Sequence, residues 1–189
     1  HLRTYSLKSL IKLMKYYDLN IINAFTSDRY GGNIQAHFSK KNQIKNISNV
    51  RNILNKENKS GLNYEKTYIN FFNKIQTAKD NLHKFLKKNK NKKIVGKAFP
   101  ARASVLIHFF EYLKNYIDTI YEQPSSKKNN HYIPGTNIQI KSSKSLKKSN
   151  PDIILIFAWH MFDEIKNKWI KRGLINTKYV KPLPKLKIK

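Results

Sequence analysis

The chain has 189 residues, which suits one full hydrophobic core with room for part of a second domain. Its hydrophobic content of 40% argues against a disordered tail, and the absence of Cys excludes disulfides and thiolate zinc sites within the chain. The net charge of +27 would suit nucleic acid, but only five of the 38 basic residues are Arg, the residue suited to bidentate phosphate and base recognition. We therefore expect no specific nucleic-acid binding.

Two further features bear on location and completeness. No apolar run approaches the length of a membrane span, and no signal peptide can be made out. We therefore expect a soluble, cytoplasmic protein that contacts no membrane. The chain begins at His1, and its first turns resemble the middle of a domain, so we also expect a fragment of a longer protein.

The first forty residues predict one helix and two strands. Apolar residues recur at helical spacing from Leu7 onward, and Ser6 is placed to cap this helix. Residues 19–25 predict a strand, and residues 33–39 alternate apolar and polar side chains, which is typical of a half-exposed antiparallel strand. Because so few elements cannot bury their own apolar faces, we expect residues 1–40 to need a further sheet to pack on.

Residues 41–90 predict a helical linker. One apolar stripe begins at Ile44 and a second, rich in Tyr and Phe, includes Tyr68 and Phe72, with a break between the two helices at 58–63. An aromatic stripe at helical spacing is more often packing than a binding surface, so we expect this stripe to be buried.

The last hundred residues alternate strands and helices. The expected strands are 93–95, 117–121, 138–140, 153–158 and 179–180, and the main expected helices are 104–113 and 161–172. The run 153–158 is apolar throughout, as in a central parallel strand that is buried on both faces. This order predicts an α/β fold, a Rossmann-like doubly wound parallel sheet over residues 91–189, with ligands at the carboxyl ends of its strands.

Three loops are expected to meet at that edge of the sheet. The first, 96–104, contains Gly96, Pro100, Arg102 and Ser104. A strand, a small-residue loop and a helix start form a geometry that suits a phosphate, and Arg can supply a bidentate partner. The same pattern also occurs in α/β proteins that bind nothing there, so the pattern alone leaves ligand binding open.

The other two loops contribute further candidate binding residues. Tyr132 and Gly135 lie in a turn that could equally be a plain hairpin or crossover turn. Trp159 and His160 directly follow the buried strand, so an indole is available for stacking and an imidazole for hydrogen bonding. Asp163 falls in the first turn of the next helix, where a carboxylate suits the helix dipole, and we interpret it as a capping residue.

Neither a metal site nor a catalytic motif stands out. No pair of His residues has a helical metal-ligand spacing, and neither a Gly-x-Ser-x-Gly sequence nor a Walker loop is present. From the residue patterns alone, the sequence predicts a binding domain.

Stretches along nearly the whole chain resemble the C-terminal half of the nucleotide-sugar C-methyltransferases, class I S-adenosylmethionine-dependent enzymes of deoxysugar biosynthesis. These stretches are HLRTYSLKSLIKL, YGGNIQAHFSKK, VGKAFPARASVLIHF, HYIPGTNIQI, PDIILIFAWHMFDEI and KPLPKLKI. The resemblance implies that residues 1–40 are the last helix and strands of a truncated methyltransferase domain, whose S-adenosylmethionine site lies upstream. It also implies that residues 91–189 help to hold the nucleotide-sugar substrate.

The resemblance further implies a catalytic role for His1. In the family a Glu-His pair, with a Tyr just ahead of it, stands before the Tyr-Ser-Leu helix start; His1 matches the His, and the Glu and Tyr are missing. A neutral imidazole is a competent base for the proton next to a sugar ketone, and the resulting enolate can take up the cofactor's methyl group. Without the cofactor and a positioned substrate, we expect the fragment that carries His1 to be catalytically inactive.

Some features depart from the family pattern, and two other functions stay open. Lys97 and Phe99 stand where related sequences usually carry smaller residues, and Phe99 is expected to narrow the nucleotide site. The first alternative is a non-catalytic basic module that binds nucleic acid or another polyanion. The second is an inactive fragment.

Overall fold

The computed structural model describes residues 4–28, 32–41 and 47–189. Its chain divides into two compact units, residues 1–72 and residues 73–189, which we describe separately. The assignment of residues 1–40, 41–90 and 91–189 to domains of a methyltransferase stays a prediction.

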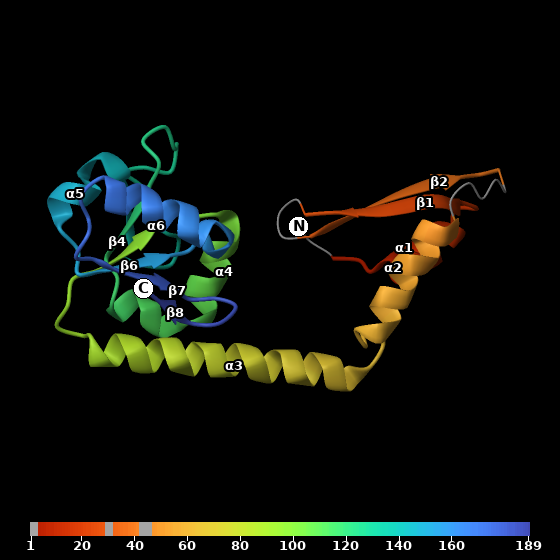
Figure 1. The fold of residues 1–189 in the computed structure, drawn as a ribbon, viewed down its shortest axis with the longest axis horizontal. Coiled ribbons are helices and arrows are strands. Elements are labelled where there is room, and N and C mark those ends of the chain that lie inside the picture. Colours follow the sequence, from red (N-terminus) through yellow and green to blue (C-terminus); the bar gives the residue numbers. More distant parts are fainter. Residues whose placement is uncertain (1–3, 29–31, 42–46) are drawn as a thin grey trace. The chain divides into compact units, whose positions relative to one another are not determined.

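The first unit combines a two-stranded antiparallel sheet with helices (Figure 1). Its elements are α1 (Leu7–Lys15), β1 (Asn20–Ser27), β2 (Asn33–Ser39), α2 (Ile47–Lys59) and the first turns of α3 (Glu65–Lys88). The predicted helix, both strands and the break between two helices are confirmed, and the side chain of Ser6 accepts a hydrogen bond from the Ser9 N–H as an N-cap. Ile44, expected in the first apolar stripe, lies outside the described residues.

The core of this unit is small. It consists of Leu7, Ala24, Val50 and Ile53, with partly buried neighbours around them. A buried carboxylate adds to it, because Glu57 on α2 accepts hydrogen bonds from the N–H groups of Leu7 at 2.5 Å and Lys8 at 3.1 Å. A carboxylate at a helix N-terminus satisfies unpaired donors and suits the dipole, so Glu57 joins α2 to the start of α1.

The second unit contains the predicted parallel sheet, in the order β5-β4-β3-β6-β7-β8. Its elements after α3 are β3 (Ile94–Lys97), α4 (Ala101–Phe109), the 3-10 helix η2 (Glu111–Asn115), β4 (Thr119–Glu122), β5 (Gln139–Ser142), η3 (Ser143–Ser145), α5 (Leu146–Ser149), β6 (Ile153–Ile156), η4 (Trp159–Met161), α6 (Phe162–Lys171), β7 (Lys178–Lys181) and β8 (Lys187–Ile188). Strands β3 to β7 are parallel, and β8, which the sequence did not predict, is antiparallel to β7. The α/β Rossmann-like fold is confirmed.

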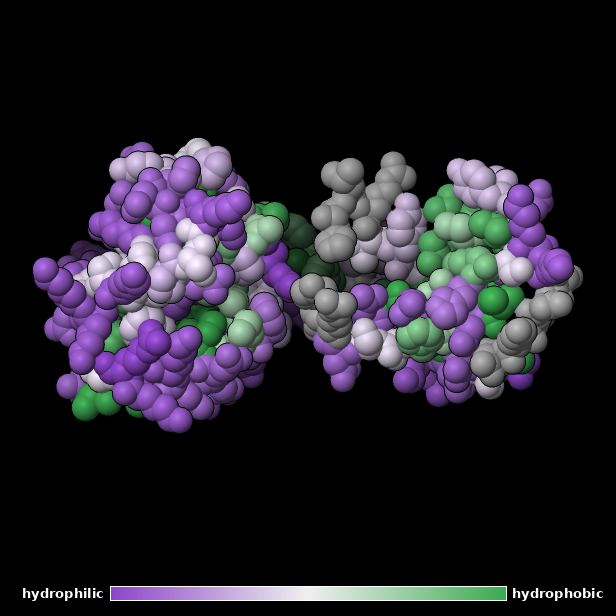
Figure 2. Space-filling model, turned by 90° about the horizontal axis from the view of Figure 1, so that it is seen from above, coloured by the Kyte–Doolittle hydropathy of each residue, from purple (hydrophilic) through white to green (hydrophobic). Residues whose placement is uncertain are grey.

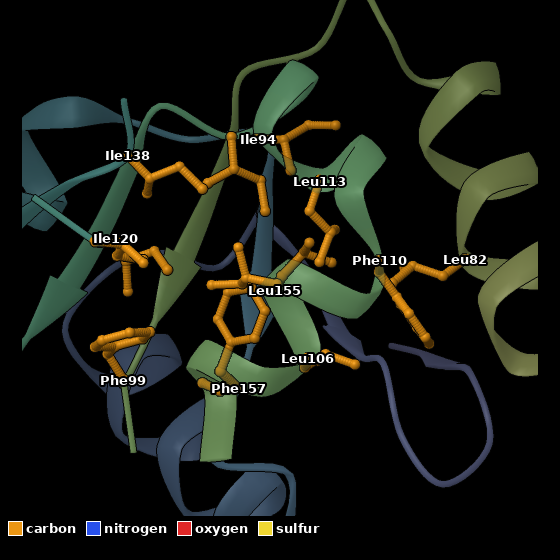
Figure 3. Close-up of a cluster of buried hydrophobic side chains, with 14 of the residues drawn as sticks. Leu82, Ile94, Phe99, Leu106, Phe110, Leu113, Ile120, Ile138, Leu155 and Phe157 are labelled. Atoms are coloured by element: carbon orange, nitrogen blue, oxygen red, sulfur yellow. The ribbon is translucent and has the colours of Figure 1, made fainter. Parts of the chain in front are cut away.

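Helices cover both faces of this sheet, α6 on one side and α3 with α4 on the other (Figure 1). The larger core lies on the α3 and α4 side and includes Leu82, Leu106, Phe110, Ile120 and Phe157 (Figure 3). The smaller core on the α6 side is built around Val95, Ile154, Trp169 and Tyr179. All four residues of β6 are buried, as expected for a central parallel strand.

Helix α4 begins three residues earlier than predicted, at Ala101 instead of Ser104. Pro100 lies just before it as the N-cap residue; its fixed φ and missing N–H suit a helix start. The buried stripe is Ala103, Leu106, Ile107 and Phe110, at helical spacing. Val105 therefore falls on the opposite side of the helix and is 71% exposed.

The aromatic stripe of α3 packs only in its C-terminal half. Leu82 and Leu86 are fully buried against the larger core, whereas Tyr68 and Phe72 are 55% and 51% exposed. The prediction that the whole stripe is buried is therefore wrong. Helical spacing identifies the face of a helix but not how far along that face a neighbour extends.

Candidate functional site

The candidate site lies at the carboxyl ends of β3 and β6, two strands that pair in parallel along their whole length. After β3 the chain turns through Ala98 and enters α4, whose N-terminus has no side-chain cap hydrogen bond. The first N–H groups of a helix have no intrahelical acceptor and carry the positive end of the dipole. This edge of the sheet therefore offers an uncapped helix N-terminus to an anion.

Arg102 in the first turn of α4 meets Trp159, which starts η4 three residues after the end of β6. The guanidinium carbon of Arg102 lies 5.7 Å from the centre of the indole ring. Trp159 is half-buried and packs against the larger core, whereas Arg102 is exposed. The structure thus brings together two predicted site residues that are 57 positions apart, with a planar cation held against an aromatic face.

A hollow of about 360 Å³ opens beside this pair. Its lining runs from Trp159 through His160, Met161 and Phe162 to Asp163 and Glu164, and includes Lys181 and Pro184 from the far wall. His160, a predicted site residue, is exposed at this hollow. The indole, an imidazole and an ammonium group are therefore available within one concave surface.

Charged side chains of both signs line the hollow, namely Asp163, Glu164 and Lys181, and further Lys side chains surround Asp163. Asp163 lies within 4.0 Å of three ammonium groups, those of Lys166, Lys187 and Lys189, and Lys189 donates a hydrogen bond to it at 3.2 Å. That hydrogen bond lowers the pKa of Asp163 below its usual range, and Lys187 acts in the same direction. Asp163 lies in the first turn of α6, as predicted, but no side chain among the described residues caps this helix by a hydrogen bond. The partners of Asp163 are the Lys side chains, and these ion pairs join α6 to β8 and Lys189.

The remaining predicted residues of the first loop have different surroundings. Pro100 is the half-buried N-cap residue of α4, and Ser104 is half-buried one turn into that helix. Gly96 lies inside β3, fully surrounded by core: a Cβ there would come within 2.5 Å of Ile120 Cγ1 and 2.8 Å of Phe157 Cε2. Gly96 therefore allows close packing within the sheet.

Tyr132 and Gly135 do not share the edge of the sheet where Arg102 lies. Tyr132 forms an antiparallel bridge with Gln139, the first residue of β5, so it lies at the amino end of that strand. A Cβ on Gly135 would lie 3.4 Å from Cε1 of His108 in the last turn of α4. The expectation that this turn joins the other two loops is wrong.

The reason is the path of the loop between β4 and β5. Its first part, up to Lys128, stays at the carboxyl edge, where the Lys128 ammonium donates a hydrogen bond to the carbonyl of Phe99. The chain then runs back beside β5, with hydrogen bonds from Asn130 N–H to Ile140 O and from Ile140 N–H to His131 O, before it turns. One loop therefore reaches both ends of the sheet.

The family model of the C-methyltransferase C-terminal domain matches residues 28–184. The chain belongs to this family. A search of curated proteins finds no match to the chain. The suspected resemblance to the C-terminal half of a C-methyltransferase is thereby confirmed, and the match covers β2, α2, α3 and the parallel sheet up to Pro184.

In this C-methyltransferase C-terminal domain, Lys97 and Phe99, which depart from the family pattern, are buried and do not line the hollow. The Phe99 side chain is 7% exposed and lies in the larger core beside Ile120 (Figure 3), so the expectation that it narrows the site is wrong. Lys97 is also buried, and its ammonium donates a hydrogen bond to the carbonyl of Tyr121 at 3.1 Å. Burial lowers the pKa of Lys97 to about 8, although the Glu122 carboxylate opposes the shift.

His1, the predicted base, lies outside the described residues. Within the described ranges, no cluster of three or more His, Cys, Asp or Glu side chains lies together as metal ligands would.

Sequence reasoning missed several residues of this edge. Lys181 ends β7, Lys187 starts β8 and Lys189 follows it. The alternation of apolar and charged residues after Pro184 was the available signal for β8. Glu122 and Lys128 were missed as well. A single acidic residue at the end of a strand was the only signal for Glu122.

Proposed function

We propose that this chain is the substrate-binding part of an S-adenosylmethionine-dependent C-methyltransferase that acts on a nucleotide-linked keto-deoxysugar. Membership of the C-methyltransferase C-terminal domain family supports the reaction class. The observation that carries the binding role is the meeting of Arg102, Trp159 and the uncapped start of α4 at the carboxyl edge of the parallel sheet. Open α/β sheets bind their ligands at this edge.

In this proposal the diphosphate group of the nucleotide-sugar binds at Arg102 and the first N–H groups of α4. A guanidinium and a helix N-terminus are both suited to phosphate oxygens. Trp159 supplies an aromatic face for a base or a sugar, and His160 and Lys181 supply donors at the hollow. The surplus of ammonium groups around Asp163 favours a ligand with more than one negative charge.

We assign the cofactor site to a separate methyltransferase domain. Among the described residues, no strand of the parallel sheet is followed by a glycine-rich loop, and the turn after β3 carries Ala98, Phe99 and Pro100, with Phe99 filling the core. These residues do not fit S-adenosylmethionine, so we derive no step through it in this chain. His1 is proposed as the base that removes the proton beside the sugar ketone.

The first unit supports the proposal of a partner domain. Among the residues of this unit that the structure describes, four apolar side chains form the buried core, whereas Tyr16 and Tyr17 are 78% and 65% exposed. A two-stranded sheet with so small a core is marginal alone. A methyltransferase domain packed against this unit would add apolar surface to its small core.

The binding role is tested by thermal unfolding with uridine 5′-diphosphate or thymidine 5′-diphosphate. A ligand at about 100 times its Kd stabilises a protein by about 2.7 kcal/mol, so we expect the better nucleotide to raise the Tm by several degrees. Arg102→Ala is expected to abolish the rise. Arg172→Ala is a matched control, because Arg172 also stacks on a Trp, with its guanidinium carbon 5.1 Å from the ring of Trp169. No rise for the unaltered protein at millimolar nucleotide would overturn the binding role.

A further inference from the structure

The peptide groups of Phe99 are held by two charged side chains from another part of the chain. The Oε2 atom of Glu122 accepts a hydrogen bond from the Phe99 N–H at 2.8 Å. The ammonium of Lys128 donates a hydrogen bond to the Phe99 carbonyl at 2.6 Å. Glu122 is the last residue of β4 and Lys128 lies in the loop after it, whereas Phe99 lies in the loop after β3. These contacts therefore join the β3–α4 loop to the end of β4 and the β4–β5 loop.

Ala98, the residue before Phe99, has an unfavourable backbone conformation. Ala98 has φ 62°, in the left-handed region that residues with a Cβ adopt at a cost. Its N–H donates a hydrogen bond to the carbonyl of Tyr121 at 2.9 Å, so the turn starts directly at the end of the β3–β4 pairing. A strained turn of this kind persists only where the surrounding contacts fix it.

Three further contacts fix the position of Phe99, the residue after Ala98 in this turn. The ring of Phe99 is buried in the larger core, and the Lys128 ammonium lies 5.4 Å from the centre of that ring. The second carboxylate oxygen of Glu122 accepts the N–H of Gln123 at 2.8 Å, which fixes the carboxylate relative to its own loop. Phe99 is thus held through its N–H, its carbonyl and its side chain.

We propose that Glu122 and Lys128 are positioning residues that hold the β3–α4 loop so that Arg102 lies against Trp159. This inference takes the identity of the ligand from the proposed function, but the contacts that hold the loop do not depend on which ligand binds. Arg102 is three residues after Phe99, with Pro100 as the N-cap between them, so the place of Phe99 sets the place of the guanidinium. Neither Glu122 nor Lys128 is assigned a contact with the nucleotide.

Lys128→Met tests the positioning role most directly, and Lys127→Met is its matched control. Both remove one positive charge from the same loop and keep an apolar stem, but only Lys128 bonds to Phe99, so a difference between them is not due to net charge. By calorimetry we expect Lys128→Met to weaken binding of the better nucleoside diphosphate about tenfold, because small displacements at a binding site reduce affinity strongly. Lys128→Arg, which keeps a cationic donor, is expected to stay within about twofold of the original affinity.

A second measurement does not depend on any ligand. Amide hydrogen exchange of Phe99 and Ala103 reports on the loop and on the first turn of α4, where the Ala103 N–H donates to the carbonyl of Pro100 at 2.8 Å. Lys128→Met leaves both N–H groups and their acceptors chemically intact. We nevertheless expect it to speed exchange at both amides about tenfold, whereas Lys127→Met leaves them unchanged.

Glu122→Gln provides an independent arm. The N–H groups of Phe99 and Gln123 bond to different oxygens of Glu122, and the NH2 group that replaces one of these oxygens in Gln cannot accept a hydrogen bond. We therefore expect the same faster exchange at Ala103 and the same loss of affinity. The positioning role is overturned if Lys128→Met and Glu122→Gln both keep the Ala103 exchange rate of the unaltered protein. If neither nucleotide binds the unaltered protein, the proposed function fails, and the exchange rates alone decide the positioning role.

Discussion

Gly96 lies in the middle of the sheet, and its lack of a side chain is explained by packing. A Cβ would contact Ile120 Cγ1 at 2.5 Å and Phe157 Cε2 at 2.8 Å, distances that force these side chains or the strand to move. We expect Gly96→Ala to lower the free energy of unfolding by about 1–3 kcal/mol in urea.

Nucleotide affinity separates this explanation from a direct binding role for Gly96. At a temperature where the variant is folded, we expect its Kd for uridine or thymidine 5′-diphosphate to match that of the unaltered protein. A variant with normal stability and lost binding would show that the backbone of Gly96 approaches the ligand.

Lys97 makes the stability of the second unit depend on pH. Its pKa is about 8 in the folded protein because burial disfavours the ammonium, against a value of 10.5 for an exposed Lys. Between these pH values an unfolded chain binds more protons at Lys97 than the folded protein does, so the contribution of Lys97 to the free energy of unfolding rises with pH across this window and is least favourable below about pH 8.

Lys97→Met removes this dependence and keeps an apolar stem of similar length. We expect the variant to be more stable than the unaltered protein at pH 7, by up to about 3 kcal/mol in urea unfolding, with the difference shrinking as the pH approaches 10. Lys127→Met, in an exposed loop, serves as the control and is expected to show no such trend. A Lys97→Met variant that is less stable at pH 7 would mean that the hydrogen bond to Tyr121 outweighs the cost of burying the charge.

At the scale of an element, α3 carries one stripe with two different environments. Leu82 is fully buried, whereas Phe72 is 51% exposed on the same stripe. We expect Leu82→Ala to lower the free energy of unfolding by about 2–5 kcal/mol and Phe72→Ala to change it by less than about 0.5 kcal/mol. Equal losses in chemical denaturation would show that the N-terminal half of the stripe is also packed.

At the scale of the whole molecule, the net charge of +27 governs weak contacts with polyanions. Hydrophilic side chains cover most of the surface of the parallel-sheet unit that faces the viewer (Figure 2, left). Within the described ranges, no helix combines the length and apolar character that crossing a bilayer requires.

We expect duplex DNA to bind this protein weakly, without sequence preference, and only at low salt. Such binding comes from counterion release and falls by orders of magnitude between about 50 and 200 mM salt. Fluorescence anisotropy across this range is the measurement, with a scrambled duplex as the control. Micromolar affinity that persists at physiological salt would favour the polyanion-binding alternative over the nucleotide-sugar proposal.

The sequence by itself determined the class of fold and the order of the main helices and strands up to β7, but not β8. The apolar run of β6, the alternation of β2 and the helical stripes of α1 and α6 each record which side of a segment is buried, and that information is local. The motifs along the chain also indicated the family. Pairing of the loops after β3 and β6 followed as well, because neighbouring parallel strands end at the same edge of a sheet.

Only the tertiary structure decided which loops meet and which faces are covered. Gly135 lies near His108 because the β4–β5 loop runs back along β5, and nothing in its turn residues specifies that path. The Phe99 ring fills the core instead of the site, since Glu122 and Lys128, more than twenty positions away, hold its backbone. Such contacts depend on the positions of distant segments, which residue spacing does not encode.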